Sequence, residues 1–239
     1  MREARSVFSC SLGLAITAIP LPVLGGALST VPALIGLSLF ALLLIAVERG
    51  IAAHHPHSRL GAANRITLVR AGIACLIAAR AIDPEPLGVA DRWLLGAVAA
   101  AALLLDGADG WAARRQGLAS VFGARFDMEI DALAILVLAV TTVKAAAVPD
   151  WVLAIGAMRY LKLAACWVLP PLRRPLPARS SADLRRKTIA VVQSLALLIA
   201  LVPATPPGWA EAGCATALGL LAYSFIADIV MLRCARPHR

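Results

Sequence analysis

Long apolar segments constrain this chain more than any other feature. About eight of them follow one another along its 239 residues, and each is close to the roughly 20 apolar residues that a helix needs to cross a bilayer. The segments show no alternation of apolar and polar residues, so they indicate helices rather than barrel strands. They cover residues 7–26, 31–47, 66–82, 91–113, 124–147, 151–170, 187–204 and 210–232. The sequence therefore predicts an all-α, polytopic membrane helical bundle.

The composition and the charge agree with a membrane location. Hydrophobic residues make up 60% of the chain, whereas a typical soluble domain is about 45–50% apolar. The net charge of +9 comes from basic residues in the short segments between apolar runs. Such a distribution is typical of a topology signal, so we expect no nucleic-acid partner and only membrane lipids around the basic loops.

The basic residues occupy alternate connections. By the positive-inside rule, this pattern predicts a cytoplasmic (inner) membrane protein with both termini in the cytoplasm. An alternative interpretation of the first apolar segment, 7–26, is a cleaved signal peptide. Its removal would leave the loop between residues 114 and 125 on the cytoplasmic side.

Acidic residues interrupt the apolar pattern on the predicted helix 91–113. An Asp at the centre of a membrane helix costs about 2.5–3.5 kcal/mol, so such acids are expected to face a polar cavity. Their spacing places them on one helical face with two small residues and an arginine. This first stripe consists of Asp106, Asp109, Gly110, Ala113 and Arg114.

A second acidic stripe follows on the predicted helix 124–147. Gly123, Asp127 and Asp131 recur at every fourth position, which places them on one face, whereas Glu129 lies off that face. The connection between the two helices is short, so the helices should be antiparallel neighbours. The two stripes are therefore expected to face each other at the cytoplasmic end of the bundle.

The residue types in the two stripes favour a hard divalent cation. Carboxylate oxygens without nearby His or Cys suit Mg²⁺ or Mn²⁺ better than zinc, and several carboxylates suit a pair of cations that also gather phosphate oxygens. Gly110, Ala113 and Gly123 leave room for a flat or bulky ligand against the helix backbone. The predicted metal ligands are Asp106, Asp109, Asp127 and Asp131.

The combined pattern is Asp106-x-x-Asp109-Gly110-x-x-Ala113-Arg114, then eight residues, then Gly123-x-x-x-Asp127-x-x-x-Asp131. It resembles the signature of the CDP-alcohol phosphotransferases, and every defining position is filled.

Two further segments carry a weaker likeness. Upstream, "ANRITLVR" resembles the start of the family's first core helix through Asn64, Thr67 and Arg70, although Ala63 replaces the usual proline. Downstream, "RRKTIAVVQ" is similar to a segment of phosphatidylglycerophosphate synthases.

The resemblance implies a domain organisation. Residues 61–239 would form the family's six-helix catalytic core. Residues 1–60 would add two N-terminal transmembrane helices and an interfacial connector. The resemblance also implies a homodimer.

The resemblance implies an activity as well. A phosphatidyl group would pass from a CDP-linked lipid donor such as CDP-diacylglycerol to a small polar alcohol acceptor, with release of CMP. Asp106, Asp109 and Asp127 would hold a first cation, and Asp131 would contribute to a second and accept the acceptor's proton as the general base. The nucleotide-binding residues would be Thr67, Gly110, Ala113, Arg114 and Gly123.

Basic residues on the predicted helix 151–170 bear on the acceptor. Arg159 and Lys162 lie about one helical turn apart and share a face. With Arg186 and Lys187 they could form a cationic pocket for a phosphorylated acceptor, which favours glycerol 3-phosphate or inositol phosphate over serine. The alternatives are snorkelling and ion pairing with a membrane acid such as Asp228.

Two other classes of protein stay open at the level of sequence. Carboxylates on facing membrane helices could serve a divalent-cation transporter, but these acids gather near one membrane face and leave the interleaved Gly, Ala and Arg unexplained. An inactive homologue acting as a membrane scaffold is disfavoured by the complete set of aspartates.

Overall fold

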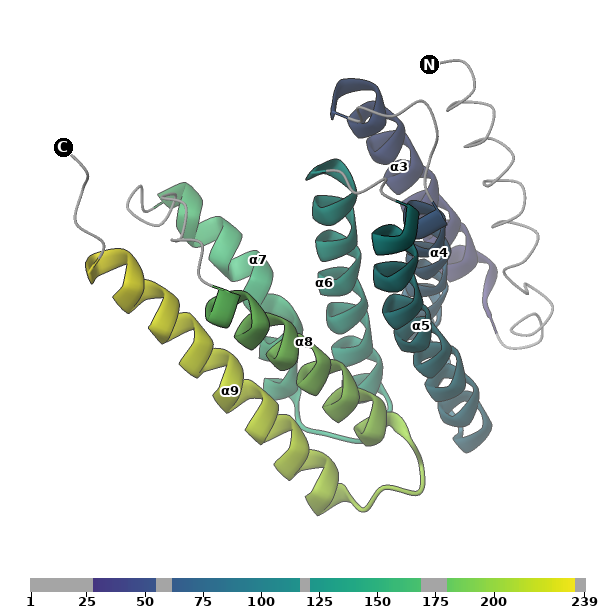
Figure 1. Cartoon of the computed structure of the whole chain (residues 1–239). Helices are drawn as coiled ribbons and strands as arrows, with labels where there is room; N and C mark the ends of the chain where they lie inside the picture. Colours follow the sequence, from purple (N-terminus) through teal and green to yellow (C-terminus); the bar gives the residue numbers. More distant parts are fainter. Residues whose placement is uncertain (1–27, 55–61, 117–120, 169–179, 235–239) are drawn as a thin grey trace. The chain divides into compact units, whose positions relative to one another are not determined.

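The computed structural model describes residues 28–54, 62–116, 121–168 and 180–234. Side chains are described within these ranges except at 51–54, 62, 108–116, 121, 166, 180–183 and 232–234. All regular structure in the described ranges is helical (Figure 1). The elements are α3 (Thr30–His54), α4 (Ala62–Ile82), α5 (Val89–Gln116), α6 (Val121–Lys144), η1 (Asp150–Val152), α7 (Leu153–Val168), α8 (Ser180–Leu201) and α9 (Pro207–Cys234).

The predicted all-α class is confirmed for the described residues, but a count of eight spans is not. Each predicted helix after residue 30 corresponds to one of the helices α3 to α9, while the predicted helix 7–26 lies outside the described residues. Among the described helices, two are long and apolar enough to cross a membrane, Thr30–Gly50 and Pro207–Met231. The remaining described helices are shorter or more highly charged: α7 has only 16 residues, and α4, α5, α6 and α8 each contain several charged residues.

The chain divides into two compact units, residues 1–137 and 138–239, and the division falls within α6. In the first unit, α3, α4 and α6 share an apolar core. Its buried members are Phe40, Leu44 and Val47 of α3, Leu68, Ala71 and Cys75 of α4, and Phe126 and Ile130 of α6. This core orients the three helices about their axes.

Helices α3 and α4 approach each other closely at Gly36. A β-carbon added there would lie 2.8 Å from the Ala79 Cβ and 3.2 Å from the Cys75 carbonyl oxygen. Small residues at such a contact allow the backbones to come together, which is how helices gain packing energy where lipid supplies no hydrophobic driving force. Any larger residue at this position would push the two helices apart.

The connection between α4 and α5 is ordered by two charged side chains. Arg80 is buried and donates to the carbonyl oxygens of Glu85 and Pro86 and to the Asp91 carboxylate, at 2.9–3.0 Å. Asp83 accepts hydrogen bonds from the Ser29 backbone N–H at 2.7 Å and hydroxyl at 3.0 Å. The start of α3 is thus tied to the end of α4.

In the second unit, α8 and α9 form the main helix pair, and α7 contacts α9. The apolar side chains of α9 are largely exposed, with Trp209 at 77%, Tyr223 at 61% and Ile226 at 62%. A broad exposed apolar face on a helix of this length is typical of contact with lipid. The described part of this unit therefore agrees with a membrane location.

Candidate active site

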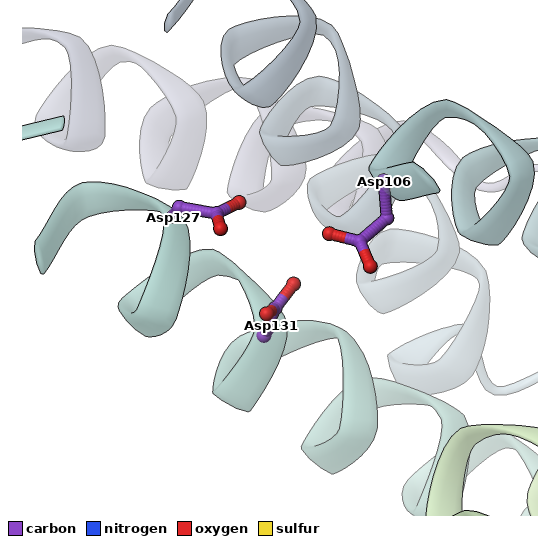
Figure 2. Close-up of side chains that lie close together, drawn as sticks. All are labelled: Asp106, Asp127 and Asp131. Atoms are coloured by element: carbon purple, nitrogen blue, oxygen red, sulfur yellow. The ribbon is translucent and has the colours of Figure 1, made fainter. Parts of the chain in front are cut away.

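Three of the four predicted metal ligands converge in the structure. Asp106 comes from α5, and Asp127 and Asp131 come from successive turns of α6, with their carboxylates directed toward one another (Figure 2). One oxygen from each carboxylate can be chosen so that all three lie within 4.8 Å of one another. The spacing of four residues on α6 produces this arrangement, because it places two acids on one helical face. We refer to these three residues as the acid triad.

Arg70 of α4 is the counter-ion of the acid triad. Its Nη1 lies 2.8 Å from Asp106 Oδ1 and 2.9 Å from Asp127 Oδ1, and its Nη2 contacts Asp131 Oδ1. The Arg70 side chain is only 5% exposed, whereas the three carboxylates are 34–38% exposed. The guanidinium is therefore more deeply buried than the carboxylates and contacts Oδ1 of each.

The acid triad has an excess of negative charge. Two carboxylates 4 Å apart repel by about 4 kcal/mol at an effective dielectric constant near 20. A guanidinium is always charged and presents five donors in a rigid fork, so Arg70 offsets this repulsion and fixes the carboxylates. Three carboxylates and one guanidinium leave two negative charges in excess, which one divalent cation would neutralise.

The donor set fits the predicted cation. It consists of carboxylate oxygens alone, which Mg²⁺ and Mn²⁺ accept, and these oxygens are partly exposed, so a hydrated ion and a phosphate could reach them. Asp109 belongs to α5, but its side chain lies outside the description. The structure therefore describes the positions of three of the four predicted ligands, and their role as metal ligands stays a prediction.

Most predicted nucleotide-binding residues cannot be placed by their side chains. Gly110, Ala113 and Arg114 belong to the part of α5 whose side chains are not described, and Gly123 is half-buried near the start of α6. Thr67 is buried, and its hydroxyl donates to the Ala63 carbonyl oxygen at 3.1 Å. Thr67 precedes Arg70 by one helical turn, so it lies on the same side of α4 as the acid triad.

A second charge cluster lies in the other unit. The side chain of Asp228, on α9, is 7% exposed, and its Oδ2 lies 3.3 Å from the Nζ of Lys162 on α7. Its Oδ1 lies 2.6 Å from the Nη2 of Arg185 and 3.1 Å from the Nη2 of Arg186, both on α8. We refer to these four residues as the basic cluster. Lys162 stands 5.2 Å from the centre of the Phe225 ring as well.

The basic cluster bears on the predicted acceptor pocket. It brings together Lys162 and Arg186 and adds Arg185, which the sequence interpretation did not select. Arg159 is half-buried and Lys187 is exposed. The ion pairs described for Asp228 involve Lys162, Arg185 and Arg186 instead. The ion pairing with Asp228 considered from the sequence is present, and it leaves three cations around one carboxylate.

The helical fold, the two apolar helices and the acid triad together indicate a class: a membrane protein with a cluster of carboxylates that could hold a divalent cation. The profile of the CDP-alcohol phosphatidyltransferase family matches residues 60–230, more than half of the chain, and the chain belongs to that family. It is therefore a transferase of substituted phosphate groups. No curated protein and no solved structure matches the chain.

Proposed function

We propose that this enzyme transfers a phosphatidyl group from CDP-diacylglycerol, or a similar CDP-linked lipid, to glycerol 3-phosphate and releases CMP. The observation that carries the proposal is the acid triad in a chain of the CDP-alcohol phosphatidyltransferase family. Phosphoryl transfer depends on positioning and on neutralisation of charge more than on covalent help from the protein. A site rich in carboxylates at the end of membrane helices suits that chemistry.

The proposed cofactor is a pair of Mg²⁺ or Mn²⁺ ions. Asp106, Asp127 and Asp131 would hold them together with Asp109, and when bound the ions would neutralise the charge of the diphosphate. Asp131 would accept the proton of the attacking hydroxyl as the general base. Its position one turn along α6 from Asp127 keeps its carboxylate beside the other ligands.

The proposed nucleotide-binding residues are those that the family signature indicates. Gly110, Ala113 and Gly123 would allow close approach of the nucleotide, and Arg114 would bind its phosphates. Thr67 would line the cytidine pocket, which its place on α4, one turn before Arg70, supports.

The basic cluster supports a phosphorylated acceptor. Three cations around one carboxylate leave an excess of two positive charges, which suits a dianionic phosphate. Lys162 and Arg186 would be the main contacts of this phosphate, with Arg159 and Lys187 at the rim. Inositol phosphate carries the same group and is the first alternative, whereas serine lacks it.

The remaining proposals concern the setting of the enzyme. Its orientation in a cytoplasmic membrane, with the acid triad and both termini on the cytoplasmic side, rests on the distribution of basic residues. The homodimer and the division into residues 1–60 and 61–239 rest on the family likeness. We put the divalent-cation transporter second, because the acid triad and the family match are better explained by transfer chemistry.

The proposed function is tested by CMP release. Purified enzyme is supplied with CDP-diacylglycerol, Mn²⁺ or Mg²⁺, and either glycerol 3-phosphate, inositol phosphate or serine. We expect CMP release that needs the metal and is fastest with glycerol 3-phosphate. The absence of metal-dependent CMP release with any acceptor would refute the proposal, and turnover with serine alone would refute the acceptor. Uptake of Mn²⁺ into liposomes without CMP release would favour the transporter.

A further inference from the structure

Helix α3 packs against two of the helices that carry the acid triad and its counter-ion, although it lies outside the segment that matches the family profile, residues 60–230. One face of α3 makes this contact. Its residues recur at intervals of three and four, as one helical face requires: Gly36, Phe40, Leu44, Val47 and Gly50. Other α3 side chains such as Val31, Leu34 and Leu42 are 57–66% exposed.

Glycines near the two ends of this face allow two different close approaches. Gly36 lies against Ala79 of α4, as described above. A β-carbon on Gly50 would lie 2.4 Å from the Phe122 ring of α6. The Phe122 ring in turn stacks on Phe126, with ring centres 6.1 Å apart. Helix α3 therefore contacts α4 at one end and α6 at the other.

Core residues that pack with α3 are the sequence neighbours of residues in the candidate site. Phe126 and Ile130 are buried in it, and each is followed directly by a carboxylate of the acid triad, Asp127 or Asp131. On α4, buried Ala71 directly follows Arg70. Neighbouring residues on a helix point about 100° apart, so burying these apolar side chains fixes the direction of the charged ones.

We propose that α3 is a positioning element of the active site, which sets the rotation of α4 and α6 and thereby the cation affinity of the acid triad. Phe40, which is 4% exposed, is the central positioning residue of this face. The inference rests on the proposed function only in that the acid triad binds a divalent cation. It gives a role to a helix that precedes the family segment.

The test compares a buried and an exposed residue of the same helix. Phe40→Ala opens a cavity in the core, whereas Leu42→Ala removes a side chain that is 63% exposed. Mn²⁺ binding to the full-length protein in detergent is measured by the electron paramagnetic resonance of free Mn²⁺, well below the unfolding temperature. We expect Phe40→Ala to weaken binding about tenfold, Phe40→Leu to restore most of it, and Leu42→Ala to leave it unchanged.

A second pair of variants covers the case in which Phe40→Ala fails to fold. Gly50→Ala adds one methyl group that displaces the Phe122 ring, and Gly213→Ala adds one on α9 where nothing lies within 4 Å. We expect weaker Mn²⁺ binding only in Gly50→Ala. If Gly50→Ala lowers the unfolding temperature but binds Mn²⁺ as tightly as the wild type and Gly213→Ala do, α3 is merely structural and the inference is overturned.

The same titration separates the inference from the proposed function. If the wild type binds no Mn²⁺, there is no cation affinity for α3 to set, and both the inference and the proposed metal fail. If the wild type binds Mn²⁺ and the α3 variants bind it equally well, only the inference fails.

Discussion

The acid triad and the basic cluster have opposite compositions but the same arrangement. In the first unit, three carboxylates surround Arg70, which is 5% exposed, and they are 34–38% exposed themselves. In the second unit, three cations surround Asp228, which is 7% exposed, and they are 23–39% exposed. In each cluster the single ion is buried and the three opposite ions are more accessible.

This comparison separates two roles within a charge cluster. A buried ion that contacts three opposite charges is costly to leave unpaired, so it fixes their positions. The three outer ions retain excess charge and exposure, so they are the groups available to a ligand. The acid triad is suited to a cation and the basic cluster to an anion. If the buried ion orders each cluster, replacing it should disturb the outer ions as well.

The largest expected effect comes from an outer ion of the acid triad. Asp131→Asn keeps the shape of the side chain but removes a metal ligand and the proposed base, so kcat for CMP release should fall by at least about 100-fold. Glu129→Gln is the matched control, because Glu129 is an exposed acid on the same helix that lies off the stripe. Equal loss in both variants would contradict the assignment of Asp131.

Removal of the buried cation should come next. Arg70→Gln leaves three carboxylates without their shared counter-ion, and we expect the metal-free protein to lose about 3 kcal/mol of stability. This is the low end for breaking a buried pair, because the carboxylates are one-third exposed. Thermal unfolding in detergent should show a larger stabilisation by Mn²⁺ in the variant than in the wild type, with Arg70→Lys between them. Unchanged unfolding without metal would show that Arg70 does not order the acid triad.

Removal of the buried anion tests the basic cluster in the same way. Asp228→Asn should let Lys162, Arg185 and Arg186 repel one another and lose their positions. We expect KM for glycerol 3-phosphate to rise about fivefold, with a smaller effect on kcat, since the chemistry lies at the acid triad. Glu211→Gln alters an exposed acid of the same helix and should leave KM unchanged. A lower KM in Asp228→Asn would mean that the carboxylate competes with the phosphate.

The smallest effect is expected at Asp83, whose hydrogen bonds from Ser29 involve uncharged donors. The hydrogen bond from the Ser29 backbone N–H holds the pKa of the Asp83 carboxyl below its usual value. The hydrogen bonds from the Glu85 backbone N–H and the Ser29 hydroxyl act in the same direction. Because the folded pKa is lower than the unfolded one, the stabilisation is present above the unfolded pKa of about 3.9 and is lost as pH falls through the folded pKa.

This contribution can be measured by thermal unfolding between pH 3 and pH 7. Asp83→Asn should unfold at a slightly lower temperature than the wild type near neutral pH, and the difference should close in acid. It should also be less sensitive to salt than the Arg70 effect, because salt screens charged pairs most. A difference that grows toward low pH would contradict the assignment.

Much of the fold can be predicted from the sequence, because long apolar helices are recognised by their length and their apolar composition. The helices from α3 to α9 were expected from such runs, and the acid triad followed from a spacing of three and four residues. Spacing predicts faces on one helix but not which helices meet. For that reason the pairing of Arg70 with Asp127 and Asp131, which are 57 and 61 residues away, was not predicted.

The basic cluster shows the same limit. The sequence indicated Asp228 as a partner for membrane cations, because an acid in an apolar helix needs one. It did not indicate Arg185, since a run of basic residues in a loop resembles a topology signal whichever of its members turns inward. The contact of α3 with α6 at Gly50 was equally hidden, because a glycine in a helix has several explanations.

The contacts of Arg70 also have a consequence for how the chain enters the membrane. An unpaired Asp in a membrane helix makes its insertion unfavourable by about 2.5–3.5 kcal/mol. If α5 and α6 span the bilayer, as the sequence predicts, they carry three such residues, those of the acid triad. Arg70 lies on α4 and is synthesised before all of them. Partitioning of α5 and α6 into lipid should therefore be assisted by α4 already being there, so that these three helices leave the insertion machinery as a group rather than one at a time.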